Sequence, residues 1–306
     1  MRLDGPESRN VEDRRGQGGG GGFGRGGGGG GLRIGGGIGG VILLLIGLFF
    51  GVDLSGFVGG GGGGQVGYQQ PPAQGRPFDA GTAARPPAQD DAGRRFVAQV
   101  LGETEAVWRE QFARAGRTYP EPRLVLYSGS TRSGCGFAQA QVGPFYCPAD
   151  QTVYIDLDFM ARLQARLGAR GDFASAYIIA HEVGHHVQNV LGVLRRSEAA
   201  RARYGEGSVE SNQTQVRIEL QADCLAGVWA NNAQRARRIL EEGDVEEGLG
   251  AAAAVGDDHI QRTQGRGYVQ PETFTHGTSA QRVRWFRRGL QYGTVEACDT
   301  FSPERV

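Results

Sequence analysis

The stretch His181-Glu182-Val183-Gly184-His185 places two histidines four residues apart in a segment that is otherwise largely apolar. If this segment is an α-helix, both imidazoles lie on one face, about one turn apart. Two imidazole nitrogens in that arrangement can bind one Zn²⁺ at about 2.0–2.1 Å. Glu182 is rotated by roughly a quarter turn from His181, so its carboxylate can reach a metal-bound water without binding the metal. The stretch therefore predicts a zinc-binding helix in which Glu182 acts as general base.

The same pattern also occurs without a metal, as two surface histidines beside an ordinary helix glutamate. The flanking residues favour a buried helix, because Tyr177-Ile-Ile-Ala180 precedes the motif and Val187 follows it. Gly184 costs about 1 kcal/mol in a helix interior, so we expect another backbone to approach the helix closely there. Asp172 is a candidate N-cap of this helix, and Gly192 is a candidate signal for its end.

A catalytic zinc site needs three protein ligands and an open fourth position, so a third ligand must come from elsewhere in the chain. The segment Ile218-Glu219-Leu-Gln-Ala-Asp223-Cys224 again places two acids four residues apart on an apolar helix. We assign Glu219 to the metal, and Asp223 to a hydrogen bond that fixes the tautomer of one histidine. If Glu219 is not the third ligand, Asp223 and His259 are the next candidates.

The other three histidines have weaker signals. His276 lies in a polar loop before a helix, where it could stabilise the oxyanion of a tetrahedral intermediate or simply mark the helix entry. For His259 a structural role is favoured, because the ligand set is already complete. His186 follows a ligand directly on the helix, so we expect it to face away from the metal and to pack.

The pattern of apolar residues over the last two thirds predicts one α+β domain, mainly helical with a small sheet. Apolar residues at three- and four-residue steps indicate helices, and alternating ones indicate strands. The predicted helices cover about residues 96–112, 156–167, 173–191, 213–234 and 280–290, and the predicted strands cover residues 123–127 and 152–156. Either strand could accept an extended peptide at an exposed edge.

The N-terminal third has the composition of flexible chain interrupted by one apolar run. Residues 16–31 and 59–64 are nearly all Gly, and residues 69–93 are rich in Gln, Pro, Ala and Gly. Glycine loses the most backbone entropy on ordering and buries no side chain. We therefore divide the chain into a disordered Arg- and Gly-rich tail (1–33), a transmembrane helix (34–52), a flexible linker (53–93) and a zinc domain (94–306).

The apolar run at residues 34–52 predicts a membrane anchor. As a helix it covers about 28 Å, close to the roughly 30 Å of a hydrocarbon core. Six arginines precede it and none follows until Arg76, so the positive-inside rule predicts a single-pass protein of the cell membrane with a cytoplasmic N-terminus and an extracytoplasmic zinc domain. A cleaved signal peptide or a buried core helix are the alternatives; the first lacks a small-x-small cleavage site, and the second has only Gly-rich flanks.

The cysteines and the net charge narrow the class of protein further. Four cysteines without a C-x-x-C pair are more typical of two disulfides than of a zinc knuckle. Three pairings are possible, and we prefer Cys135 with Cys147 and Cys224 with Cys298. The alternative is four buried free thiols, which would fit a cytoplasmic protein. The formal net charge of zero argues against nucleic acid as a partner.

Several segments together resemble the bacterial neutral zinc metallopeptidase family. They are residues 8–15, 133–137, 143–150, 180–188, 219–229 and 274–282. The resemblance implies a zincin-like fold, a zinc cofactor, and hydrolysis of a peptide or protein substrate. The acidic pair is also similar to that of gluzincins, including the integral-membrane prenyl-protein peptidases, in which a Glu placed like Glu219 is the third ligand. Those enzymes hold the substrate carbonyl with a His and an Arg, positions that His276 and Arg282 could match.

We therefore expect a membrane-anchored zinc metallopeptidase, endopeptidase-like, with Glu182 as general base. A catalytically inactive scaffold or binding module of the cell envelope is an alternative, although a scaffold has no need of Glu182. A zinc hydrolase of a non-protein amide, such as one in cell-wall material, is another, because its chemistry is the same.

Overall fold

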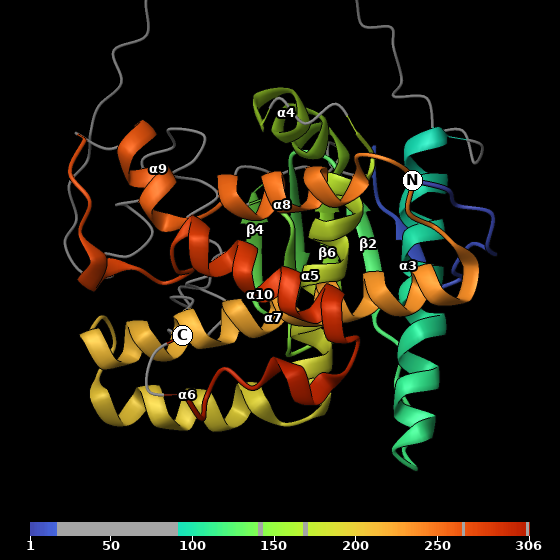
Figure 1. The fold of residues 1–306 in the computed structure, drawn as a ribbon. Helices are drawn as coiled ribbons and strands as arrows, with labels where there is room; N and C mark the ends of the chain where they lie inside the picture. The colour runs from blue at the N-terminus through green and yellow to red at the C-terminus, as the bar shows by residue number, and fades with distance from the viewer. Residues whose placement is uncertain (17–90, 140–142, 168–170, 265–266, 304–305) are drawn as a thin grey trace, which may run out of the picture.

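The structure is a computed structural model that describes residues 1–16, 91–139, 143–167, 171–264, 267–303 and 306 (Figure 1). Its centre is a four-stranded sheet with the strand order β1-β2-β6-β5. The first three strands in that order are parallel, and β5 runs antiparallel to β6. The strands are β1 (Val11–Asp13), β2 (Arg123–Tyr127), β5 (Phe145–Cys147) and β6 (Thr152–Asp156). A separate antiparallel hairpin consists of β3 (Ser130–Ser133) and β4 (Gly136–Gln139).

Helices form most of the remaining described chain. They are α3 (Ala92–Arg114), α4 (Leu157–Leu167), α5 (Phe173–Val190), α6 (Val193–Tyr204), α7 (Val209–Arg237), α8 (Asp244–Ala254), α9 (Asp257–Gln264) and α10 (Ser279–Tyr292), with the 3₁₀ turns η2 (Pro271–Thr273) and η3 (Val295–Cys298). Figure 1 shows α7 crossing α5, with α10 lying along α7. The predicted α+β domain, mainly helical with a small sheet, is confirmed.

Glycines set how closely the central helices approach one another. A Cβ on Gly184 would lie 3.0 Å from the carbonyl oxygen of Ala222, so α5 and α7 cross in backbone contact, as the sequence predicted. A Cβ on Gly289 of α10 would lie 1.9 Å from the carbonyl oxygen of Cys224, which no side chain allows. Through these two close contacts α7 packs directly between α5 and α10. Larger residues at either glycine would push the helices apart.

The two predicted strands have the predicted bounds, but not the predicted role. Both are internal: β2 lies between β1 and β6, and β6 lies between β2 and β5. The prediction that one of them offers an exposed edge to a peptide is therefore wrong. The edge on the side of α5 is β5, which the sequence did not predict as a strand.

The N-terminal residues 1–16 pack on the domain, although we expected them to be part of a disordered tail. Val11–Asp13 pairs in parallel with Leu124–Leu126. The buried Ser8 hydroxyl donates a hydrogen bond of 2.6 Å to Glu105, which also accepts one from the Asn10 amide. The rest of the predicted tail, the predicted anchor and most of the linker lie outside the described residues. Among the described helices, none is long and apolar enough to cross a membrane.

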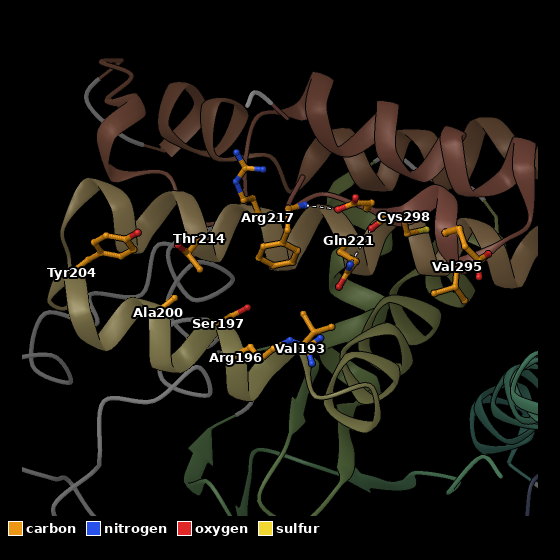
Figure 2. Close-up of a pocket in the computed structure, with 13 residues that line it drawn as sticks. Val193, Arg196, Ser197, Ala200, Tyr204, Thr214, Arg217, Gln221, Val295 and Cys298 are labelled. Atoms are coloured by element: carbon orange, nitrogen blue, oxygen red, sulfur yellow. Dashed lines mark hydrogen bonds between the residues drawn. The ribbon is translucent and has the colours of Figure 1, made fainter. Parts of the chain in front are cut away.

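Two disulfides hold the domain, in the pairing preferred from the sequence. Cys135–Cys147 joins the β3–β4 hairpin to β5, and Cys224–Cys298 joins α7 to η3. Beside the second disulfide, a groove of about 640 Å³ runs between α6, α7 and the segment after α10 (Figure 2). Gln221 and Cys298 line this groove, whereas none of the candidate zinc ligands does.

Candidate metal centre

The motif lies on α5, which the sequence specifies closely. The helix ends at Val190, and Gly192 follows in the left-handed conformation, with φ of 73°, that the sequence predicted for its end. Asp172 precedes the helix but makes no capping hydrogen bond; its carboxylate contacts the amino group of Met1 at 2.5 Å instead. The predicted capping role of Asp172 is therefore wrong, although the helix begins where expected.

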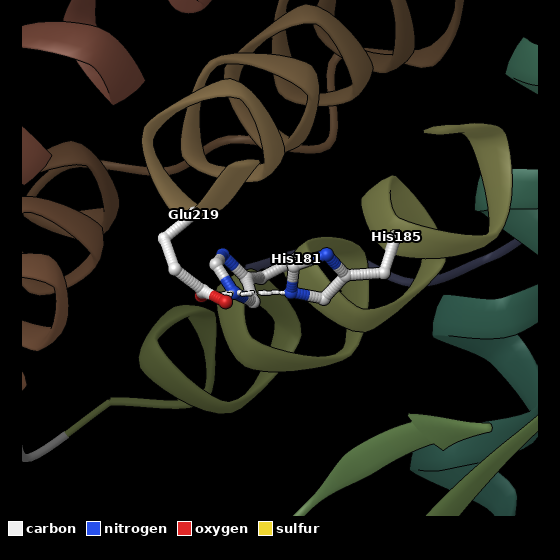
Figure 3. A group of neighbouring side chains, drawn as sticks. All are labelled: His181, His185 and Glu219. Atoms are coloured by element: carbon white, nitrogen blue, oxygen red, sulfur yellow. Dashed lines mark hydrogen bonds and ion pairs between the residues drawn. The ribbon is translucent and has the colours of Figure 1, made fainter. Parts of the chain in front are cut away.

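The structure brings His181, His185 and Glu219 together (Figure 3). Both imidazoles come from α5, and the carboxylate reaches them from α7. The two Nε2 atoms lie 3.2 Å apart, and Oε2 of Glu219 lies 3.2 Å from the first and 3.5 Å from the second. Ligand atoms around a tetrahedral zinc with bonds of about 2.0–2.1 Å lie roughly 3.3 Å apart, so the spacing suits this ion.

The protonation of the two rings explains why the cluster needs a cation. Nδ1 of His181 lies 2.9 Å from a carboxylate oxygen of Asp223, and Nδ1 of His185 lies 2.8 Å from Oε1 of Gln188. Both partners only accept hydrogen bonds, so each neutral ring carries its proton on Nδ1. Two bare Nε2 lone pairs and a carboxylate then face one another in a buried space, which is costly unless a positive charge lies between them.

His181 is held through a buried ionic network. Asp223 accepts a hydrogen bond of 2.5 Å from the Tyr177 hydroxyl in addition to the one from His181. Arg282 of α10 donates to both oxygens of the same carboxylate, each at 2.8 Å. Asp223 thus lies beside one of the two histidines, as expected, and its role in orienting a metal ligand stays a prediction. Arg282, which the resemblance placed beside the substrate carbonyl, is instead bonded to Asp223.

Glu182 lies at the edge of the cluster and is almost fully buried. Its Oε2 atom has no hydrogen-bond partner among the described residues. Burial raises the pKa of Glu182, while His185 and His181 act in the opposite direction. A backbone hydrogen bond from Tyr146 of β5 reaches the same carboxylate. An unpaired carboxylate oxygen beside a candidate metal site can accept a proton from a water that binds there.

Neighbouring side chains shift the pKa values of His181 and Glu219 in the direction opposite to burial. Burial alone would lower the pKa of His181, but hydrogen bonds to Asp223 and Glu219 raise it to about 9. Burial likewise disfavours the ionised form of Glu219, yet His185 and His276 hold the pKa of that carboxyl well below its usual range. A second proton on the His181 ring supplies the positive charge that the cluster needs while no metal is bound, and a metal ion that enters displaces this proton.

His276 is buried near the cluster and is held by a residue that the sequence did not reveal. Oδ2 of Asp257 accepts three backbone N–H groups, from Thr275, His276 and Gly277, at 2.7–2.9 Å. Nδ1 of His276 lies 3.0 Å from the Thr275 hydroxyl and 3.6 Å from Oδ1 of Asp257. An acid in a polar run before a loop carries no distinctive spacing, so only the fold could identify this role of Asp257.

The remaining histidines lie outside the cluster. His186 faces away from it, with Nδ1 at 3.0 Å from the Tyr146 hydroxyl and Nε2 at 2.6 Å from the carbonyl oxygen of Pro120. Burial lowers the pKa of His186 to about 4, so this ring is neutral. His259 lies exposed on α9 and is not part of the group that could hold a metal.

Comparisons with known proteins agree with this geometry. The family model "Putative neutral zinc metallopeptidase" matches residues 1–301. YpfJ of Escherichia coli (strain K12) is 47% identical over 298 residues, which cover 96% of each chain. Mb2605 of Mycobacterium bovis is 44% identical over 226 residues, covering 69% of this chain and 73% of that protein. Both relatives carry names that describe no activity. No solved structure matches the chain. The chain belongs to the neutral zinc metallopeptidase family.

Proposed function

We propose that this protein is a zinc-dependent peptidase, with His181, His185 and Glu219 as ligands and Glu182 as general base. The observation that carries the proposal is the buried set of three donors with the unpaired Glu182 oxygen beside it. When bound, zinc polarises the scissile carbonyl and lowers the pKa of a water. Glu182 would take a proton from the attacking water, whose oxygen joins the carbonyl carbon, and would deliver that proton to the amine that leaves when the C–N bond breaks.

Two further elements fit a role around the peptide. His276 is held rigidly by Asp257 and can donate a hydrogen bond to the oxyanion of the tetrahedral intermediate. β5 is the edge strand beside α5, and its Tyr146 backbone already contacts Glu182. An extended peptide added along β5 would pass the general base, with main-chain hydrogen bonds holding it in register.

The decisive test is Glu182→Gln in the purified full-length chain. The amide has nearly the shape of the carboxylate and leaves the three ligands in place, so we expect zinc content to stay at the wild-type value. Cleavage of a mixed peptide library should fall by at least about a hundredfold, because general-base catalysis contributes 10²–10⁴-fold. Normal turnover by the variant would exclude this mechanism, and zinc-loaded wild type without any cleavage would favour an inactive scaffold.

We also propose that the zinc domain works outside the cytoplasm, since two disulfides persist in oxidising compartments. The predicted single crossing at residues 34–52 does not agree with the position of residues 1–16 beside the zinc domain. A single crossing would put residues 1–16 and the zinc domain on opposite sides of the bilayer, but β1 and β2 pair in one sheet. We propose that residues 1–16 and the zinc domain lie on the same side of the membrane.

This topology can be tested with single cysteines on the two exposed positions Arg9 and Glu110. A membrane-impermeant maleimide applied to intact cells, or to spheroplasts where an outer membrane is present, should label Arg9→Cys and Glu110→Cys equally. Labelling of Glu110→Cys alone would restore the cytoplasmic N-terminus predicted from the arginine distribution. The four native cysteines are paired and give no background.

A further inference from the structure

The second histidine is positioned by a chain of hydrogen bonds that runs away from the cluster. Gln188, fully buried on α5, accepts from Nδ1 of His185 at 2.8 Å. Its own amide nitrogen donates to the carbonyl oxygen of Ile218 at 2.8 Å and to Oε1 of Gln221 at 3.0 Å. The amide of Gln221 donates in turn to the carbonyl oxygen of Cys298 at 3.0 Å. This chain therefore links a candidate zinc ligand to the backbone of a disulfide-bonded cysteine.

The direction of the chain is fixed at its far end. A backbone carbonyl can only accept, so Cys298 obliges Gln221 to point its NH₂ group outwards and its oxygen towards Gln188. That oxygen, together with the carbonyl of Ile218, obliges Gln188 to point its NH₂ group away from His185. Gln188 then offers only an oxygen to the imidazole. His185 must carry its proton on Nδ1, which leaves the Nε2 lone pair for a metal.

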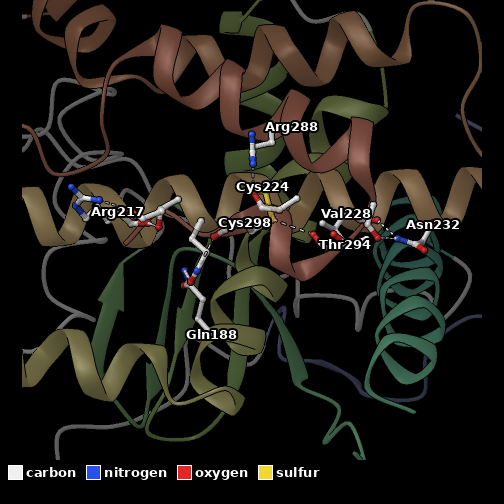
Figure 4. Close-up of a disulfide and its surroundings, with 12 residues drawn as sticks. Gln188, Arg217, Cys224, Val228, Asn232, Arg288, Thr294 and Cys298 are labelled. Carbon is white, nitrogen blue, oxygen red and sulfur yellow. Dashed lines mark hydrogen bonds between the residues drawn. A yellow bond between two sulfur atoms is a disulfide. The ribbon is translucent and has the colours of Figure 1, made fainter. Parts of the chain in front are cut away.

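The far end of the chain is held by the second disulfide. Figure 4 shows Cys298 joined to Cys224 of α7, with Gln188 reaching towards the same place from α5. The outer end is also open to solvent, because Gln221 and Cys298 line the groove between α6 and α7 (Figure 2). His185, at the inner end, is fully buried.

We propose that Gln188 and Gln221 are positioning residues that fix the tautomer of His185, and that the Cys224–Cys298 disulfide anchors them. The proposal deepens the proposed function, because it rests on His185 being a zinc ligand. Removing an orienting partner of a ligand typically weakens metal binding by 10–100-fold. The loss should be largest at Gln188, smaller at Gln221, and smaller again when the disulfide is removed, since other hydrogen bonds also hold the segment after α10.

The sharpest test is Gln221→Leu. Leucine has nearly the same size but can neither accept from Gln188 nor donate to Cys298, so only the Ile218 carbonyl is left to orient the Gln188 amide. We expect zinc affinity, measured by competition with a chelator, to fall about 10-fold. Gln99→Leu is the matched control, because Gln99 also donates its amide to a backbone carbonyl, at 3.1 Å from Leu3 and far from the metal.

The second readout needs no metal. The chain has only five histidines, so the ring ¹⁵N resonances can be assigned in zinc-free protein. His185 should be the Nδ1–H tautomer in the wild type and should populate the Nε2–H tautomer in Gln188→Leu and, to a smaller extent, in Gln221→Leu. Wild-type affinity and an unchanged tautomer in Gln221→Leu would overturn the proposal, even if Gln188→Leu fails to fold.

The two disulfides provide a paired comparison. Replacing both Cys224 and Cys298 by Ser should weaken zinc binding several-fold, whereas replacing both Cys135 and Cys147 should leave zinc affinity unchanged. Equal effects of the two double variants would remove the disulfide from the proposal. Wild-type protein that binds no zinc at all would refute the proposed function instead, and the tautomer measurement would still report on the chain of glutamines.

Discussion

The two histidines of the motif lie one helical turn apart but are held by opposite kinds of interaction. His181 is oriented by charges, through the carboxylate of Asp223 and the guanidinium of Arg282. His185 is oriented by neutral amides that end at a backbone carbonyl. A buried ionic network is costly to break because a lone charge remains, whereas a broken amide chain leaves only unpaired dipoles. Substitutions on the ionic side, around His181, and on the amide side, around His185, should therefore lower the stability of the protein by different amounts.

Glu219 is the point where both sides meet, and its removal should have the largest effect. Glu219→Ala deletes the charged donor that faces both Nε2 atoms, so we expect the purified protein to lose stoichiometric zinc, as measured by metal analysis after gel filtration. Gln215, which donates to Glu219 at 2.9 Å, provides the control. Gln215→Leu should keep the metal with reduced affinity. Full zinc content in Glu219→Ala would transfer the third ligand to another residue, with Asp223 the next candidate.

Breaking the ionic side should cost more stability than breaking the amide side. Asp223→Ala leaves the guanidinium of Arg282 buried without its partner, which costs about 3–5 kcal/mol. Gln188→Leu leaves the His185 N–H and the side-chain oxygen of Gln221 without their partners, at about 1–3 kcal/mol. Urea unfolding of zinc-free protein measures both. If Gln188→Leu proves the more damaging change, the distinction between the two sides is wrong.

The smallest effect should come from Tyr177, at the margin of the ionic network. Tyr177→Phe removes only the hydroxyl that donates to Asp223, which still has Arg282 and His181. We expect a loss of about 1 kcal/mol in unfolding free energy and a modest loss in zinc affinity. Tyr154→Phe, which removes a hydroxyl bond to Asp150 at 2.7 Å, is the matched control and should leave zinc affinity unchanged.

The sequence predicted the features that depend on the periodic spacing of residues along a helix or a strand. The four-residue spacing within α5 and α7 placed His181, His185, Glu219 and Asp223 on facing helices, and Gly184 indicated their close crossing. The spacing could not reveal Gln188 and Gln221. Glutamine is common on helix surfaces, and its importance here depends on which carbonyl lies beyond it.

The parts that the sequence missed depend on long-range contacts. β1 and β5 are three residues each, too short for an alternating pattern to appear. Residues 1–16 looked like the start of a tail because a glycine tract follows them. Their pairing with β2 joins residues that are far apart in the sequence, so no local pattern indicates it. The role of Arg282 shifted for the same reason: its partner, Asp223, lies on another helix.

The N-terminal strand also protects the sheet. Without β1, the backbone groups of Leu124 and Leu126 on β2 would form an open parallel edge, to which another chain could add a strand. A truncation that begins after the glycine tract would thus expose a template for aggregation while leaving every candidate zinc ligand in place.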